Sequence, residues 1–262
     1  MTRAAHLLRA AGGCLALYAG LLLLGAMLLA ATAACVPIVL PMTRAARRRV
    51  TRAMAAGTFR GYLAVLEAVG MLEVDLGEIE PLRDAGPLVV APNHPSLLDA
   101  VLMISRMPRA TCIMKAGLQD NLFLGAGARL AGYIRNDTPR AMVRHAVESL
   151  RAGDPLLVFP EGTRTVREPV NALGGAFALI ARKAGVPIQL VFIETDSPFL
   201  RKGWPLWRRP SFPLRYRVRL GPRIDACGPT EEILTRAFAA FERGLGSGPR
   251  SAGLLLDPSV GT

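Results

Sequence analysis

An uninterrupted apolar segment near the N-terminus constrains this chain of 262 residues more than any other feature. No charged residue occurs from Ala10 to Thr43, and the stretch from Leu15 to Leu40 consists mainly of Leu, Ala, Val and Gly. A helix of about 20 such residues is long enough to cross the hydrocarbon core of a bilayer. The segment therefore predicts a membrane helix, or a helix pair lying within one leaflet.

The charges beside this segment predict its orientation. Two arginines, Arg3 and Arg9, precede it, whereas five follow it: Arg44, Arg47, Arg48, Arg49 and Arg52. Because basic residues favour the cytoplasmic side, we expect the rest of the chain to face the cytoplasm from the inner membrane. A cleaved signal peptide is the alternative, since residues 31–35 resemble a cleavage site, but its apolar region usually has only about 7–15 residues.

A second helix is predicted from Arg44 to about Leu72. Its apolar residues recur at helical spacing and its arginines gather at one end, as in helices that lie at a membrane interface. We therefore expect three parts: membrane-anchoring helices over residues 1–72, one catalytic domain over residues 73–245, and a flexible tail rich in Gly, Ser and Pro over residues 246–262.

Short apolar runs alternate with amphipathic stretches after Pro87, which predicts an α/β domain. The predicted strands cover residues 88–91, 111–115, 132–135, 155–159, 186–193 and 214–220. The predicted helices cover residues 96–106, 139–153, 174–184 and 230–245, and a Gly-rich helical stretch is predicted from the end of the strand 111–115 to residue 131.

The composition favours a membrane surface as the partner of this basic chain. The formal net charge is +12 while 51% of the residues are hydrophobic. Only 6% are aromatic, and neither a zinc-finger spacing nor an aromatic RNA-binding pattern occurs, so nucleic acid is disfavoured. The cysteines are scattered, which predicts neither a metal site nor a disulfide framework: Cys14, Cys35, Cys112 and Cys227.

Histidine is scarce, which narrows the search for a general base. Of the three histidines, His6, His94 and His145, only His94 has a carboxylate at a suggestive spacing, Asp99. An imidazole can take a proton near neutral pH, and a carboxylate on its other nitrogen fixes the tautomer and stabilises the cation. His94 and Asp99 are therefore the predicted catalytic dyad.

A second polar motif, Pro160 to Arg164, follows the predicted strand 155–159. Gly162 allows close backbone approach to a ligand, Thr163 offers a hydroxyl, and Arg164 has a planar fork suited to phosphate. Ligands of open α/β sheets bind at the carboxyl ends of strands, so this loop and the dyad can share one cleft.

Together these motifs resemble the glycerolipid acyltransferase family, whose hallmarks are Asn-His-x-x-x-x-Asp and, further along, Phe-Pro-Glu-Gly-Thr-Arg. Both are complete here, and the resemblance covers about Leu88 to Ile193. It implies a mixed central sheet flanked by helices, as in glycerol-3-phosphate acyltransferase, with an N-terminal helix or helix pair embedded in the membrane. It further implies no cofactor and no metal.

The resemblance also implies the reaction and the roles. His94 would deprotonate an acceptor hydroxyl that attacks an acyl thioester, from acyl-carrier protein or acyl-CoA, while Asp99 orients the base. The acceptor would be a lysophospholipid, 1-acyl-sn-glycerol-3-phosphate, and the product phosphatidic acid. The residues expected to bind substrate are Asn93, Lys115, Arg135, Glu161, Gly162, Thr163 and Arg164.

One motif departs from the family pattern. The family usually ends a strand with an Asp-Arg pair that helps bind the acceptor phosphate, whereas this chain has Gly132-Tyr133-Ile134-Arg135-Asn136. Arg135 or Arg140 could replace that pair, or the acceptor could lack the usual phosphate. An acyltransferase of a specialised membrane lipid, such as an aryl-polyene, ornithine or glycolipid, is therefore the first alternative.

Two other classes of protein stay open as alternatives. A membrane-associated hydrolase would need a nucleophile, and Ser96 is near His94, but its position suits a helix cap and no G-x-S-x-G elbow occurs. The second alternative class is a noncatalytic membrane-bound binding module that keeps the motifs.

Overall fold

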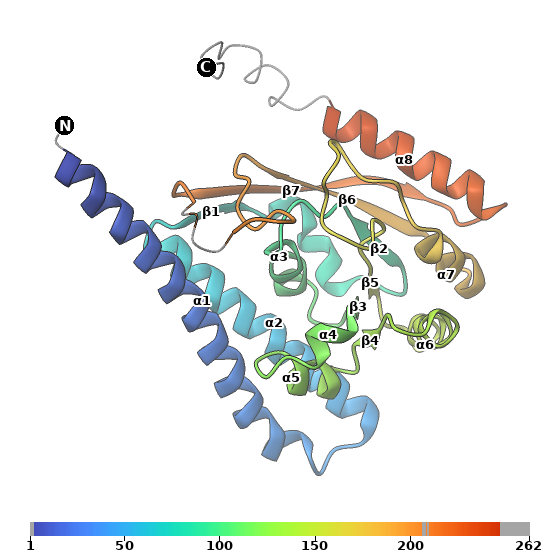
Figure 1. The fold of residues 1–262 in the computed structure, drawn as a ribbon. Coiled ribbons are helices and arrows are strands. Elements are labelled where there is room, and N and C mark those ends of the chain that lie inside the picture. Colours follow the sequence, from blue (N-terminus) through green and yellow to red (C-terminus); the bar gives the residue numbers. More distant parts are fainter. Residues whose placement is uncertain (1–2, 206–207, 209, 247–262) are drawn as a thin grey trace.

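The computed structural model describes residues 3–205, 208 and 210–246. Two long antiparallel helices, α1 (Arg3–Val39) and α2 (Arg44–Ala68), run diagonally along one side of an α/β domain (Figure 1). Within the described residues, Leu15–Val39 of α1 is the one helical stretch long and apolar enough to cross a membrane. The long apolar helix predicted at the N-terminus is therefore confirmed, and such a helix indicates membrane association.

The α/β domain is built on a seven-stranded sheet of order β1-β7-β6-β2-β5-β3-β4. All neighbouring strands are parallel except β6 and β7, which are antiparallel, so the sheet is mixed as expected. The strands are β1 (Leu72–Asp75), β2 (Val89–Pro92), β3 (Thr111–Met114), β4 (Ile134–Arg135), β5 (Leu156–Leu157), β6 (Ile188–Thr195) and β7 (Leu214–Ile224).

Helices cover both faces of the sheet (Figure 1). The remaining helices are a 3-10 helix η1 (Gly77–Asp84), α3 (Asp99–Arg106), α4 (Ala116–Gln119), α5 (Gly125–Ala131), α6 (Pro139–Arg151), α7 (Ala176–Ala184) and α8 (Thr230–Gly246). In β2, Val90 packs with α2 and α3, while its neighbours Val89 and Ala91 pack with α6, α7 and α8. This alternation follows from the two-residue period of a strand buried on both faces.

Helix α2 ends earlier than predicted. The sequence pattern suggests an end near Leu72, but Gly70 adopts a left-handed conformation with φ of 70°. The Met71 N–H then bonds the Leu66 carbonyl and the Gly70 N–H bonds the Glu67 carbonyl, as in a Schellman C-cap. Strand β1 begins directly after this turn and pairs with β7. Neither β1 nor η1 was predicted from the sequence.

The other differences are small. Strand β5 keeps only two residues of the predicted run 155–159, whereas β7 extends to Ile224, past the predicted end at residue 220. The predicted tail, 246–262, lies outside the described residues except for Gly246, which ends α8.

Candidate active site

The predicted dyad is assembled at the carboxyl end of β2. The Nδ1 atom of His94 lies 2.9 Å from Oδ2 of Asp99, the first residue of α3. The same Oδ2 accepts the Ser96 backbone N–H at 2.7 Å. Since Nδ1 of His94 is held by the carboxylate, Nε2 is the nitrogen left for a substrate hydroxyl. The dyad therefore has the geometry of an oriented general base.

Asp99 is fully buried, whereas the His94 side chain is 14% exposed. Burial raises the pKa of the Asp99 carboxyl to about 6, and the hydrogen bond from His94 offsets only part of that effect. Its second oxygen, Oδ1, is buried and has no hydrogen-bond partner among the described residues. The carboxylate is therefore costly in this position, as is common where a charge serves the chemistry.

The imidazole of His94 is held from one side by an aromatic ring. It stacks on Phe159 with ring centroids 4.0 Å apart and planes inclined by 24°. Its backbone is tied to the second motif, because the His94 N–H donates to Oε1 of Glu161 and the His94 carbonyl accepts the Thr165 N–H. The loops after β2 and β5 are thus joined directly at the base.

The side chains of two residues predicted to bind substrate form hydrogen bonds with other parts of the protein. Glu161 accepts not only the His94 N–H but also the Thr165 hydroxyl at 2.7 Å and the Asn171 N–H at 2.9 Å. Asn93 forms two side-chain hydrogen bonds with the backbone of Ile193 in β6. Both side chains are buried and hold the site together, and a direct role in substrate binding stays a prediction.

The rest of the second motif faces an apolar cavity. Gly162, Thr163 and Arg164 line a cavity of about 610 Å³, together with His94 and Lys115. Gly162 has φ of 64°, a conformation that favours glycine. Apart from these residues and a few others, the lining is supplied by apolar side chains of α1, α2, α3 and α5. The predicted base, His94, therefore opens into a space suited to hydrocarbon.

Arg164 and Arg135 are placed differently from one another. Nη1 of Arg164 donates to the carbonyls of Leu200 and Arg201, which orients the guanidinium at the cavity wall. Arg135 is not among the lining residues, and its guanidinium pairs with Asp120 and Asp137, each at 3.0 Å. Arg164 therefore lines the same cavity as His94. Arg135 lies outside the lining of that cavity, and its charge is balanced by the two aspartates.

Ser96 has a structural environment. Its hydroxyl is fully buried, donates to the Phe199 carbonyl, and accepts the Leu98 N–H and the Tyr216 hydroxyl. An oxygen with these three bonds braces the loop that holds Asp99. The prediction that Ser96 caps the helix is wrong, because α3 begins at Asp99 and its N-cap is Leu98, with no side-chain cap bond. Tyr216 was missed from the sequence, because it comes from the distant strand β7 and no local pattern marks it. Phe159 belongs to the Phe-Pro-Glu-Gly-Thr-Arg motif, but its stacking on His94 was not predicted.

Within the part of the chain that the structure describes, no group of three or more His, Cys, Asp or Glu side chains could hold a metal ion.

The fold of the chain is shared with a solved acyltransferase structure. The chain is similar to the crystal structure of the 1-acyl-sn-glycerophosphate (LPA) acyltransferase PlsC from Thermotoga maritima, with a TM-score of 0.62 and 21% identity over 91% of this chain and 95% of that one. It is also 31% identical over 153 residues to a lyso-ornithine lipid O-acyltransferase from Pseudomonas aeruginosa. That match includes 54% of this chain and spans 58% of the length of the relative.

Residues 73–194 match the family described as Acyltransferase, so this segment of the chain is similar to that family. The segment contains β2 to β5, with all but one end residue of β1 and of β6, and therefore the dyad, the Glu161–Arg164 motif and Lys115. The mixed α/β architecture expected from the two motifs is confirmed by the likeness to PlsC.

Proposed function

We propose that the protein transfers a fatty acyl group from an acyl thioester to the free hydroxyl of a lysolipid at the inner membrane. The observation that carries this proposal is the His94–Asp99 dyad opening into an apolar cavity whose wall includes α1. Acyl-carrier protein or acyl-CoA would supply the thioester. The catalytic domain would face the cytoplasm, in keeping with the arginines that follow α1.

The chemistry follows from the orientation of the imidazole. Nε2 of His94 takes the proton of the acceptor hydroxyl as its oxygen attacks the thioester carbonyl carbon, and Asp99 stabilises the imidazolium that forms. When the tetrahedral intermediate collapses, the carbon–sulfur bond breaks and the leaving thiolate takes the proton from Nε2. The products are an ester and a free thiol, and the reaction passes through no covalent acyl-enzyme.

We propose 1-acyl-sn-glycerol-3-phosphate as the first candidate acceptor, with phosphatidic acid as product. Two cations, Lys115 and Arg164, line the cavity beside His94, and Arg164 is oriented by two carbonyls. A guanidinium and an ammonium near the base suit an anionic headgroup.

A lyso-ornithine lipid is the second candidate, and two observations favour it. The curated relative with 31% identity acts on such a lipid by its name. Arg135, the residue expected to replace the phosphate ligand of the family, is already paired with Asp120 and Asp137. A site with less free positive charge suits an acceptor without a phosphate.

The decisive experiment supplies the purified full chain in phospholipid vesicles with acyl-CoA or acyl-carrier protein and a panel of lysolipids. We expect transfer by the wild type and a loss of at least about 100-fold for His94→Ala, because general-base catalysis contributes on this order. His145→Ala is the matched control, since His145 is exposed on α6. Preference for lysophosphatidate supports the first acceptor and preference for lyso-ornithine lipid supports the second.

The same panel excludes the alternatives. Release of free fatty acid from the thioester without any esterified product would identify a hydrolase. Equal turnover by wild type and His94→Ala would contradict catalysis by the dyad.

A further inference from the structure

The apolar cavity is long, and α1 lines most of its length. The residues of α1 in the cavity wall recur every three or four positions from Leu17 through Leu24 and Leu28 to Cys35, so they share one face of the helix. Eighteen residues of α helix span about 27 Å at a rise of 1.5 Å per residue. The cavity is therefore a slot that extends along α1.

Helix α2 lines the same slot in the opposite direction. At one end, a Cβ on Gly20 of α1 would lie 3.6 Å from Leu66 and 3.7 Å from Met71. At the other end, the Cys35 sulfur of α1 lies 3.5 Å from the Thr51 hydroxyl of α2. Residues of both helices line the slot at both ends, so the slot extends along the full stretch over which α1 and α2 face each other.

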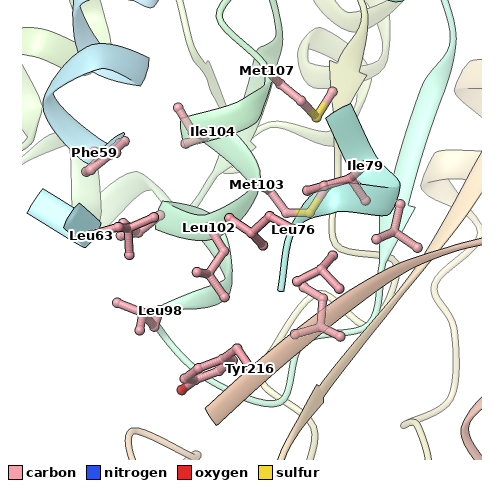
Figure 2. Packing of buried hydrophobic residues seen from close by; sticks show 14 of the residues in the cluster. Phe59, Leu63, Leu76, Ile79, Leu98, Leu102, Met103, Ile104, Met107 and Tyr216 are labelled. Carbon is pink, nitrogen blue, oxygen red and sulfur yellow. The ribbon is translucent and has the colours of Figure 1, made fainter. Parts of the chain in front are cut away.

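The dyad faces the middle of this slot. His94 follows β2, and in the strand order β6-β2-β5-β3 this places it between the loop after β6, with Phe199 and Leu200, and the end of β3 at Lys115. Figure 2 shows Phe59 and Leu63 of α2 directed toward α3, near the labelled side chains of Ile104, Leu102 and Leu98. Since Phe199 and Leu200 line one part of the slot and α5, which follows β3, lines the other, His94 lies between two apolar arms.

The arms differ in what lies beside them. We call the arm lined by Leu17, Gly20, Leu66, Met71, Phe199 and Leu200 the N-arm. We call the arm lined by Ala31, Thr32, Cys35, Thr51, Ala55 and Ala131 the C-arm. Arg164 is bonded to the Leu200 carbonyl and therefore lies on the N-arm side of the dyad.

We propose that the two arms hold two acyl chains at once, the chain of the acceptor lysolipid in the N-arm and the chain of the donor thioester in the C-arm. This inference rests on the proposed acyl transfer. An anionic headgroup at Arg164 places the acceptor chain in the adjoining N-arm, and the donor chain then occupies the other side of His94. The protein would thus select acceptors that already carry one chain.

Two variants on the same face of α1 test the arms separately. Gly20→Leu fills the N-arm, and the Cβ itself meets only ordinary contacts of 3.6 Å or more. Ala31→Leu fills the C-arm. Their matched controls are Ala19→Leu and Ala30→Leu, which add the same side chain at exposed neighbouring positions. Gly20→Val is a smaller substitution if the leucine variant does not fold.

The measurement is kcat/KM for donors and acceptors of several chain lengths with the full chain in vesicles. We expect Gly20→Leu to lower kcat/KM about tenfold or more for long-chain acceptors relative to short-chain ones, with the donor profile unchanged. Ala31→Leu should do the same for donors and leave acceptors unchanged. The controls should match the wild type.

Three results would overturn the inference. If both variants change only the donor profile, the slot is one continuous donor tunnel. If the assignments are exchanged, the placement of the two chains is wrong, and if neither variant changes a profile, the arms hold no chains. In each case the wild type still transfers acyl groups, whereas an inactive wild type would instead contradict the proposed function.

Discussion

The carboxyl of Asp99 is buried although the proposed reaction needs its charge. Because burial raises its pKa to about 6, the carboxyl becomes protonated within the physiological range of pH. A neutral Asp99 no longer stabilises the imidazolium of His94. We therefore expect kcat/KM to fall as the pH decreases through about 6, as measured with a saturating donor in vesicles. His145→Ala should keep this acidic limb, and a flat profile down to pH 5 would contradict a role for the Asp99 charge.

The same group links stability to pH. Its pKa is higher in the folded protein, about 6, than the ordinary value of 3.8, so the folded state binds a proton more tightly. The stabilisation that Asp99 contributes is complete below pH of about 4 and is lost as the pH rises through 6. Relative to Asp99→Asn, the wild type should lose up to about 3 kcal/mol of unfolding free energy over this range, at 1.36 kcal/mol per pKa unit. Denaturant titrations at both ends of the range measure it, and parallel curves would contradict it.

The candidate site could be predicted only in part from the sequence. The spacing of His94 and Asp99 and the Gly-Thr-Arg motif were sufficient to predict a base and a facing loop. The orientation of Glu161 and Asn93 toward backbone groups of other loops was not predictable, because their partners come from distant segments. The ion pairs of Arg135 depend on the path of the loop around Asp120 for the same reason.

Helix α2 is attached to the α/β domain by a buried arginine. Arg52 is 1% exposed and donates to the Ala131 carbonyl, the Arg109 carbonyl and the Asp154 carboxylate, at 2.9, 3.1 and 2.7 Å. The sequence places Arg52 among the arginines expected at a membrane surface. The burial of Arg52 could not be predicted from this run of arginines, because the burial depends on which face of α2 packs against α5.

Arg52→Met should therefore lower the free energy of unfolding by about 3 kcal/mol, because it leaves two carbonyls and a carboxylate without their donor. Arg49→Met, on the exposed side of the same helix, is the control and should change stability little. Chemical denaturation in detergent measures both. Equal stability of the two variants would show that Arg52 does not anchor α2.

The molecule as a whole combines a basic domain with an apolar helix. Exposed leucines on α1 include Leu15, Leu22 and Leu29, while the formal net charge is +12. The apolar stretch of 25 residues would hold the protein in a bilayer independently of its charge. We expect membranes carrying the protein to release it in detergent but not in concentrated salt or alkaline carbonate. Release by salt alone would mean that the arginines, rather than α1, hold the protein to lipid.

The sheet order could not be predicted from the sequence, although most of the strands could. Strand β1 has four residues and joins the sheet only through β7, more than a hundred residues away in the chain. Such pairing is decided by packing over the whole molecule, since a run as short as Leu72–Asp75 carries almost no periodicity of its own.

Because α1 both lines the cavity and presents exposed leucines on its outer side, hydrocarbon is separated from the reacting centre by the thickness of one helix. The two-chain product of the proposed reaction could then pass sideways into the lipid without crossing water. Under the proposed function, turnover would then depend on the mole fraction of lysolipid in the membrane surface rather than on its bulk concentration. Diluting the acceptor with inert phospholipid at constant bulk concentration should slow turnover in proportion to its surface density.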